Sequence, residues 1–90
     1  MPQAIADPEA LERFARQLKR FNSELQHSMK RLKGEFTRLD DTWRDQEHQK
    51  FAQEFEQTLR VLQQFSRTSE QQIPLLLRKA QKLREYLHQR

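Results

Sequence analysis

Three histidines are the side chains best suited to bind a metal ion or to move a proton in this 90-residue chain. His27, His48 and His88 lie in three separate regions, and no two have the i, i+3 or i+4 spacing that places two ligands on one helix face. Glu47-His48 matches half of the zincin motif, whose second histidine is missing. We therefore expect no metal site and place these histidines on the solvated surface.

Other catalytic arrangements are also missing from the sequence. The chain has no cysteine and a single glycine, so it offers neither thiolate chemistry nor a Gly-rich phosphate loop. No nucleophile elbow occurs, and a chain this short has little room for a concave pocket. We expect no enzyme, no catalytic residue, no cofactor and no small-molecule substrate.

The first half of the chain has the spacing of an amphipathic helix. The 3-4 alternation of its apolar residues, interrupted only at Ser28 and Glu35, predicts a helix over about residues 8–39 with these residues in its seam. Asp7-Pro8-Glu9 suits the start, because Asp can cap the free N–H groups and Pro needs no partner at the first helical position. The seam residues are Leu11, Phe14, Leu18, Phe21, Leu25, Leu32 and Leu39.

The second half predicts another long helix, over about residues 46–88. Pro74 lies inside it and removes one backbone hydrogen bond, so we expect a possible kink there within one continuous helix. Its apolar stripe consists of Phe51, Phe55, Leu59, Leu62, Phe65, Ile73, Leu76, Ala80, Leu83 and Leu87.

Only residues 40–45 remain for the connection, and so short a turn joins antiparallel neighbours. Either Asp45 or Thr42 can cap the second helix. The sequence thus predicts an all-α fold, a single helical-hairpin domain over residues 1–90. Because one hairpin buries little apolar surface, we expect it to pair into a four-helix bundle dimer.

A turn centred near residue 43 sets the expected register of the two helices. It places Leu25 near Val61 and Ser28 opposite Thr58, which predicts a small polar layer at that pair. It also leaves residues 78–90 without a partner on the first helix, so that this segment would dock on a partner subunit or fray.

The only tryptophan lies in the connection, at Trp43-Arg44-Asp45, and Phe51 follows eight residues after it. A Trp-x-Gly-like turn between two heptad-patterned helices, in a chain of this length, resembles the WXG family of small early-secreted-antigen-type proteins. The resemblance implies that Trp43 is the family's Trp, that Asp45 stands in place of its Gly, and that Phe51 is the aromatic of the second helix.

Members of that family are helical hairpins that form homo- or heterodimers, and type VII secretion systems export them without a cleavable signal. The resemblance therefore implies dimerisation and contact with secretion machinery. The family's export signal is a Tyr followed four residues later by an acid, and here Tyr86 is followed by Arg90.

Two interpretations of Trp43 remain open: a packing plug over Leu39 and Phe51 with a solvated indole N–H, or a partly exposed docking residue. Gly34 also has two interpretations. A glycine in the middle of a helix either allows another backbone or ring to approach closely, or is tolerated there without a packing role. The candidate residues for a dimer or partner interface are Gly34, Leu76, Leu83, Tyr86 and Leu87.

Charge differs along the chain, whose formal net charge is +4. Residues 35–56 are mainly acidic and residues 78–90 mainly basic, which favours an antiparallel homodimer over a parallel one. A heterodimer with a related hairpin remains an alternative. So do a non-exported helical scaffold and a basic nucleic-acid or membrane-surface binder, although the bases lack the interleaved aromatics of single-strand recognition.

The N-terminus lacks both a basic n-region and a long apolar run, so it does not have the pattern of a Sec signal peptide. We therefore expect either secretion by a signal-peptide-independent route or a cytoplasmic location.

Overall fold

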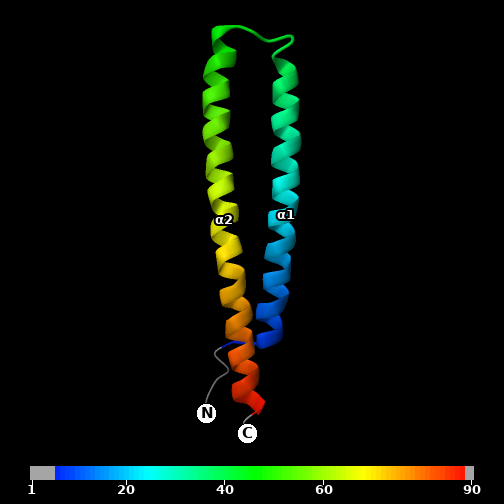
Figure 1. Ribbon diagram of the computed structural model, residues 1–90, viewed down its shortest axis with the longest axis vertical. Coiled ribbons are helices and arrows are strands. Elements are labelled where there is room, and N and C mark those ends of the chain that lie inside the picture. The colour runs from blue at the N-terminus through cyan, green and yellow to red at the C-terminus, as the bar shows by residue number, and fades with distance from the viewer. Residues whose placement is uncertain (1–5, 89–90) are drawn as a thin grey trace.

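Two long helices form most of the computed structural model, which describes residues 6–88. Helix α1 spans Pro8–Leu39, with 32 residues, and helix α2 spans Gln46–His88, with 43 residues. They lie side by side in opposite directions, so that both termini are at one end and the connection is at the other (Figure 1). The hairpin measures 69 × 18 × 17 Å. The predicted all-α, antiparallel two-helix hairpin is confirmed.

Helix α1 begins at the predicted cap. The Oδ1 atom of Asp7 accepts the backbone N–H of Glu9 at 3.1 Å, and Pro8 occupies the first turn. A capping carboxylate and an acid in the first turn both stabilise the positive end of a helix. This local sequence therefore explains where α1 starts.

Helix α2 runs through Pro74 as one element. Proline has no N–H for the carbonyl four residues before it, which is that of Glu70. Both residues are exposed, so water can reach the carbonyl that loses its partner.

The seam between the helices consists of small and medium-sized residues. In α1 the buried residues recur every seven positions, a spacing that keeps them on one helix face. They are Pro8, Ala15, Asn22 and Met29, and the buried residues of α2 are Ser66, Ser69 and Ala80.

This seam corrects the predicted one. Four residues expected inside are largely exposed, because the buried row of α1 runs beside them, through Ala15, Asn22 and Met29. They are Phe14, Phe21, Leu32 and Leu39, at 54%, 50%, 53% and 43%. The small residues of the seam let the two backbones approach, and residues 6–88 form only two helices, so a large ring fits beside the seam rather than within it.

The predicted register holds for the row of α1 that contains Phe14 and Phe21, which we call the side row, and it does not hold for the seam. Phe21 meets Phe65 edge to face, with ring centroids 5.9 Å apart, as that register requires. The expected polar layer at Ser28 and Thr58 is wrong, since Thr58 is exposed and its hydroxyl donates to the carbonyl of Glu54 at 3.1 Å.

The buried polar layer lies nearer the middle of the hairpin. Asn22 is 2% exposed, and Ser66 and Ser69 are buried as well. Gln26 donates its Nε2 hydrogen to Ser66 Oγ at 3.0 Å, whereas neither polar atom of the Asn22 amide has a hydrogen-bond partner among the described residues.

The end of α2 does have a partner on α1, contrary to expectation. Ala80 is fully buried, and the guanidinium of Arg84 forms an ion pair with the carboxylate of Glu12. The seam register differs from that of the side row, and this difference brings residues 80–84 level with the first turns of α1. Residues 89 and 90 lie outside the described part.

Neither of the helices described over residues 6–88 is long and apolar enough to cross a membrane.

Candidate functional site

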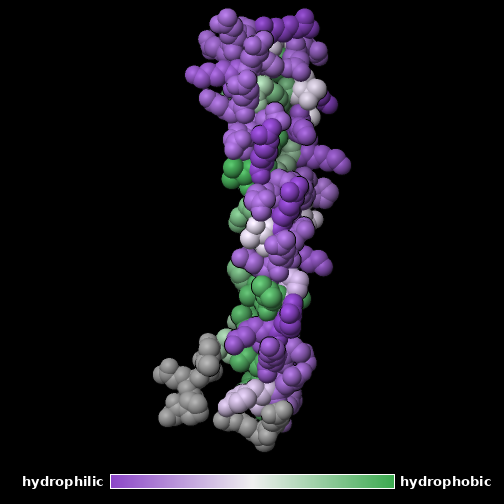
Figure 2. Space-filling model, turned by 60° about the vertical axis from the view of Figure 1, so that its left-hand side comes forward, coloured by the Kyte–Doolittle hydropathy of each residue, from purple (hydrophilic) through white to green (hydrophobic). Residues whose placement is uncertain are grey.

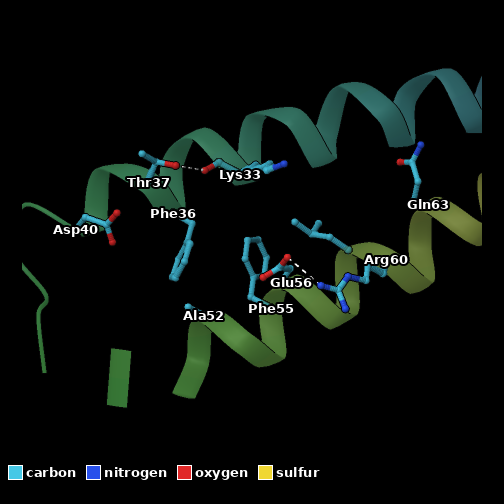
Figure 3. A pocket seen from close by; sticks show the side chains of 10 residues that line it. Lys33, Phe36, Thr37, Asp40, Ala52, Phe55, Glu56, Arg60 and Gln63 are labelled. Atoms are coloured by element: carbon cyan, nitrogen blue, oxygen red, sulfur yellow. Dashed lines mark hydrogen bonds and ion pairs between the residues drawn. The ribbon is translucent and has the colours of Figure 1, made fainter. Parts of the chain in front are cut away.

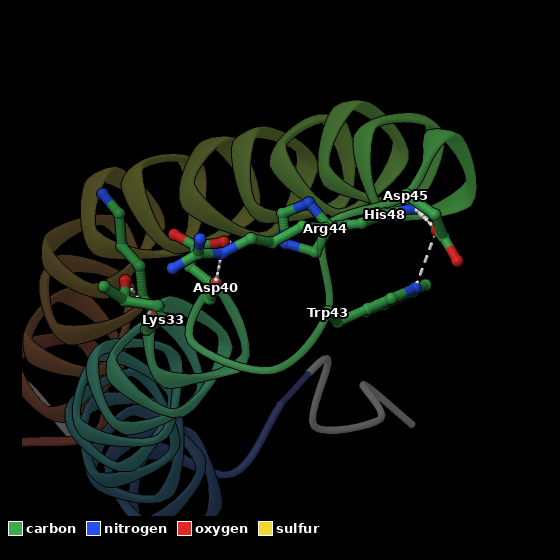
Figure 4. A network of polar contacts seen from close by, with 7 residues as sticks. Lys33, Asp40, Trp43, Arg44, Asp45 and His48 are labelled. Atoms are coloured by element: carbon green, nitrogen blue, oxygen red, sulfur yellow. Dashed lines mark hydrogen bonds and ion pairs between the residues drawn. The ribbon is translucent and has the colours of Figure 1, made fainter.

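The connection between the helices is held by the side chain of Asp45. Its Oδ1 atom accepts the indole N–H of Trp43 at 2.9 Å and the backbone N–H of His48 at 3.0 Å (Figure 4). The second contact is a helix N-cap, so Asp45 rather than Thr42 caps α2. None of the described residues has a positive φ, so Asp45 acts by capping and not through a left-handed backbone.

The Trp43 ring belongs to an aromatic cluster that closes this end of the hairpin. It meets the imidazole of His48 edge to face at 5.0 Å and lies 5.9 Å from the ring of Phe51. Phe36 of α1 stacks on His48 at 5.2 Å and contacts Phe55 at 5.1 Å. The cluster therefore joins both helices through the turn.

Two further polar contacts fix the chain between the helices. The Nε2 atom of His48 lies 2.7 Å from Oδ1 of Asp40, without the alignment of a hydrogen bond. The guanidinium of Arg44 donates to the Asp40 carbonyl at 2.9 Å (Figure 4). Within residues 6–88 no group of three acidic or histidine side chains is placed to hold a metal ion.

Trp43 combines features of both interpretations. Its ring is half-buried against His48 and Phe51, as a packing plug requires, and part of it faces solvent. The expected solvated indole N–H is wrong, because Asp45 accepts that hydrogen.

An exposed apolar surface runs along one side of the hairpin. Phe21 and Phe65 touch across it, and Phe14, Leu75 and Leu76 line the same shallow groove farther toward the termini. Figure 2 shows hydrophobic patches along the hairpin below a turn end that is covered mainly by hydrophilic side chains. We call Phe14, Phe21, Phe65, Leu75 and Leu76 the apolar flank.

The five interface candidates from the sequence fall in different places. Leu76 lies on the apolar flank, and Tyr86, 59% exposed, continues the helix row of Phe65. Leu83 is half-buried near Ala80, whereas Leu87 is 53% exposed. Gly34 is exposed, and a methyl group in place of its hydrogen would meet nothing within 4 Å.

The opposite side of the hairpin is polar. It carries the Glu12–Arg84 ion pair, the Gln26–Ser66 hydrogen bond and, closer to the turn, Lys33. We call this side the polar flank.

Two features of the structure were not predicted from the sequence: the burial of His48 and the residues that form the seam. His48, predicted to be a surface residue, has a side chain only 15% exposed and stands at the centre of the aromatic cluster. Phe14 and Phe21 were placed in the seam. The residues that follow them, Ala15 and Asn22, are also seven positions apart, and this second row is the one that is buried.

The sequence profile described as "Proteins of 100 residues with WXG" matches residues 3–86. No curated protein matches significantly. Among solved structures, the secreted protein ESXB from Bacillus anthracis str. Sterne is 32% identical, with a TM-score of 0.77, over 96% of this chain and 98% of that one. A single-residue mutant of EsxB from the same organism is 33% identical, with a TM-score of 0.80, over 90% of this chain and 94% of that one.

Proposed function

The chain belongs to the family of proteins of 100 residues with WXG, and from that membership we propose that it is a small helical interaction protein of type VII secretion that acts as a dimer of hairpins. The proposed dimer is a four-helix bundle in which the apolar flanks of two hairpins meet. The turn cluster around Trp43 would close each end of the bundle.

The exposed apolar flank is the observation that carries this proposal. Phe14, Phe21, Phe65 and Leu75 are each about half exposed, at 54%, 50%, 47% and 57%. A continuous apolar surface of this kind on a small protein is typical of an interaction site. A single hairpin seam of small residues also supplies little stability, so covering the flank stabilises the fold together with the complex.

Charge supports an antiparallel arrangement of the two hairpins. The turn end carries the acidic residues and the terminal end the basic ones, so an antiparallel pair places opposite charges side by side. Exposed ion pairs contribute little each, so apolar burial drives association and charge selects the direction. The residues involved are Asp40, Asp41, Asp45 and Glu47 at the turn, and Arg78, Lys79 and Lys82 toward the C-terminus. Arg84, which the sequence also suggested, already pairs with Glu12 on the polar flank.

We propose export through a type VII system as the biological context. The solved relatives are described as secreted proteins, which supports this view. Arg90 stands where the family's export signal has an acid, so the non-exported scaffold is the competing function. The two are distinguished by the fraction in which the protein is found in cells with a working secretion system. Detection in the cytosol alone would favour the scaffold.

Sedimentation velocity of the purified protein at tens of micromolar tests dimerisation. A homodimer is the expected result, and a well-folded monomer would reject it. A poorly folded monomer that folds only when a related hairpin protein is added would replace the homodimer with a heterodimer.

A further inference from the structure

A second surface feature lies on the polar flank, between α1 and α2. One hollow of about 590 Å³ lies near the turn, and another of about 390 Å³ lies next to it toward the termini. Lys33, Leu59 and Gln63 line both of them, so they form one continuous groove. We call it the polar-side groove.

The floor of this groove is apolar. The rings of Phe36 and Phe55 point toward each other between the helices (Figure 3), 5.1 Å apart. Ala52 and Leu59 continue the floor along α2, and Met29 adds to it from α1. An apolar floor between charged edges suits a ligand with an apolar face and charged sides.

The rim has an excess of positive charge. Arg60 on the α2 side is neutralised by Glu56, at 3.0 Å. On the α1 side, Asp40 already lies against His48. Lys30 and Lys33 lie one turn apart on α1 and form no ion pair with any other residue in the described part of the chain. Among the Lys, Arg, Asp and Glu residues that line the groove, the bases Lys30, Lys33 and Arg60 outnumber the acids Asp40 and Glu56, so the rim is positive.

We propose that the polar-side groove binds an acidic amphipathic helix of another protein. Its apolar face would lie on Phe36, Phe55 and Leu59, and its carboxylates would pair with Lys30 and Lys33. Laying an amphipathic helix between two others is a common recognition mode, because it covers apolar floor residues while the charged edges fix direction.

The length of the groove sets the length of this partner. On α1 it extends from Gln26 to Asp40, which at 1.5 Å per residue is about 21 Å. A helix of about four turns fills that distance. It would make a local three-helix arrangement over the half of the hairpin nearer the turn.

The polar-side groove and the apolar flank lie on opposite sides of the seam. Dimerisation through the apolar flank therefore leaves the groove open, and occupation of the groove leaves the flank free. The proposal goes beyond dimerisation and does not depend on it. Each surface can fail its own test while the other passes.

A designed peptide tests the proposal. The probe is a helix of about four turns with Leu at i, i+3, i+4 and i+7 spacing and Glu at the flanking positions. The comparison peptide carries Lys in place of each Glu. Binding to the full chain is measured by calorimetry, and the site is located by the changes in amide NMR shifts. We expect binding of the Glu peptide only, with shifts at Lys33, Phe55 and Leu59 and not at Phe21 or Phe65.

A charge-reversal pair sharpens the test. The double variant Lys30→Glu with Lys33→Glu should weaken binding of the Glu peptide by about tenfold or more, because both charge contacts become repulsive. The control, Lys50→Glu with Arg20→Glu, makes the same change in net charge at exposed positions outside the groove. It should change the affinity by less than about twofold. Thermal melting checks that both variants fold.

Four results would overturn the proposal. The first is failure of the Glu peptide to bind, and the second is equal weakening of its binding by both double variants. The third is NMR shifts that fall on the apolar flank. The fourth is binding of a random DNA duplex by a protein that does not bind the peptide, with the DNA binding lost in the Lys30→Glu, Lys33→Glu variant. That last result would assign the lysines to a polyanion instead.

Discussion

The indole N–H of Trp43 and the backbone N–H of His48 both donate to a single oxygen of Asp45, at 2.9 and 3.0 Å. That oxygen joins the motif's tryptophan to the first turn of α2. Asp45 stands where the WXG motif has Gly, and a glycine can make neither contact. In this chain the third motif residue therefore fixes the turn through its side chain.

Replacing Asp45 with Ala should lower the free energy of unfolding by about 1 kcal/mol, the usual effect of removing a helix N-cap. Loss of the indole contact should add to it. Asp45→Asn is the matched control, since its side-chain oxygen can accept the same two hydrogens. Urea unfolding at one protein concentration measures the difference. Equal stability of the Ala and Asn variants would show that the capping oxygen does not contribute.

Replacing Asn22 with Leu should stabilise the protein. Both polar atoms of the buried amide lack a hydrogen-bond partner among the described residues, and such a group costs about 1–3 kcal/mol to bury. The control is Gln17→Leu, at an exposed position of the same helix. Denaturant midpoints should rise for the first variant and stay nearly constant for the second. A lower midpoint for Asn22→Leu would mean that the amide is satisfied in solution.

The variant Gly34→Ala tests whether this glycine is needed for close packing or is merely tolerated in the helix. The added methyl group meets nothing within 4 Å, so the variant should gain about 1 kcal/mol from helix propensity alone. Thermal melting measures that gain, and sedimentation measures the dimer, which should be unchanged. A weakened dimer would instead place Gly34 in a subunit interface.

The sequence was sufficient to predict the fold class. Helical spacing in both halves, a cap at Asp7 and too few residues for anything but a tight turn are all local features, and each has a direct structural consequence. The WXG resemblance was readable because Trp43 and Phe51 keep their places around the turn even without the Gly.

The assignment of the seam could not be obtained in the same way. Adjacent rows of α1 are both apolar in part, and side-chain size favours the row of Phe14 and Phe21 over that of Ala15 and Asn22. Burial depends instead on how closely two backbones approach, which is a property of the pair of helices. The burial of the His48 side chain is likewise set by two rings, Phe36 on the other helix and Trp43 in the connection, so the residues next to it in sequence do not reveal it.

The double variant Phe21→Gln with Phe65→Gln should weaken the dimer and leave the hairpin helical. These rings touch on the apolar flank, and loss of a buried interface aromatic usually costs a factor of about ten or more in affinity. Leu77→Gln is the control, because Leu77 is 43% exposed and lies outside the apolar flank. Sedimentation equilibrium gives the dissociation constants. Equal effects of both changes would remove the apolar flank from the interface.

The distance between two spin labels tests the antiparallel dimer most directly. The chain has no cysteine, so Gln49→Cys, at an exposed position near the turn, provides one label per subunit. In an antiparallel pair the two turns lie at opposite ends, so the labels should be roughly 48 Å or more apart, one length of α1. A parallel pair would hold them within about 20 Å, two interhelical spacings. A distance near the longer value is the predicted result. A distance near the shorter value, or no dipolar coupling at a concentration where the protein is folded, would contradict the account.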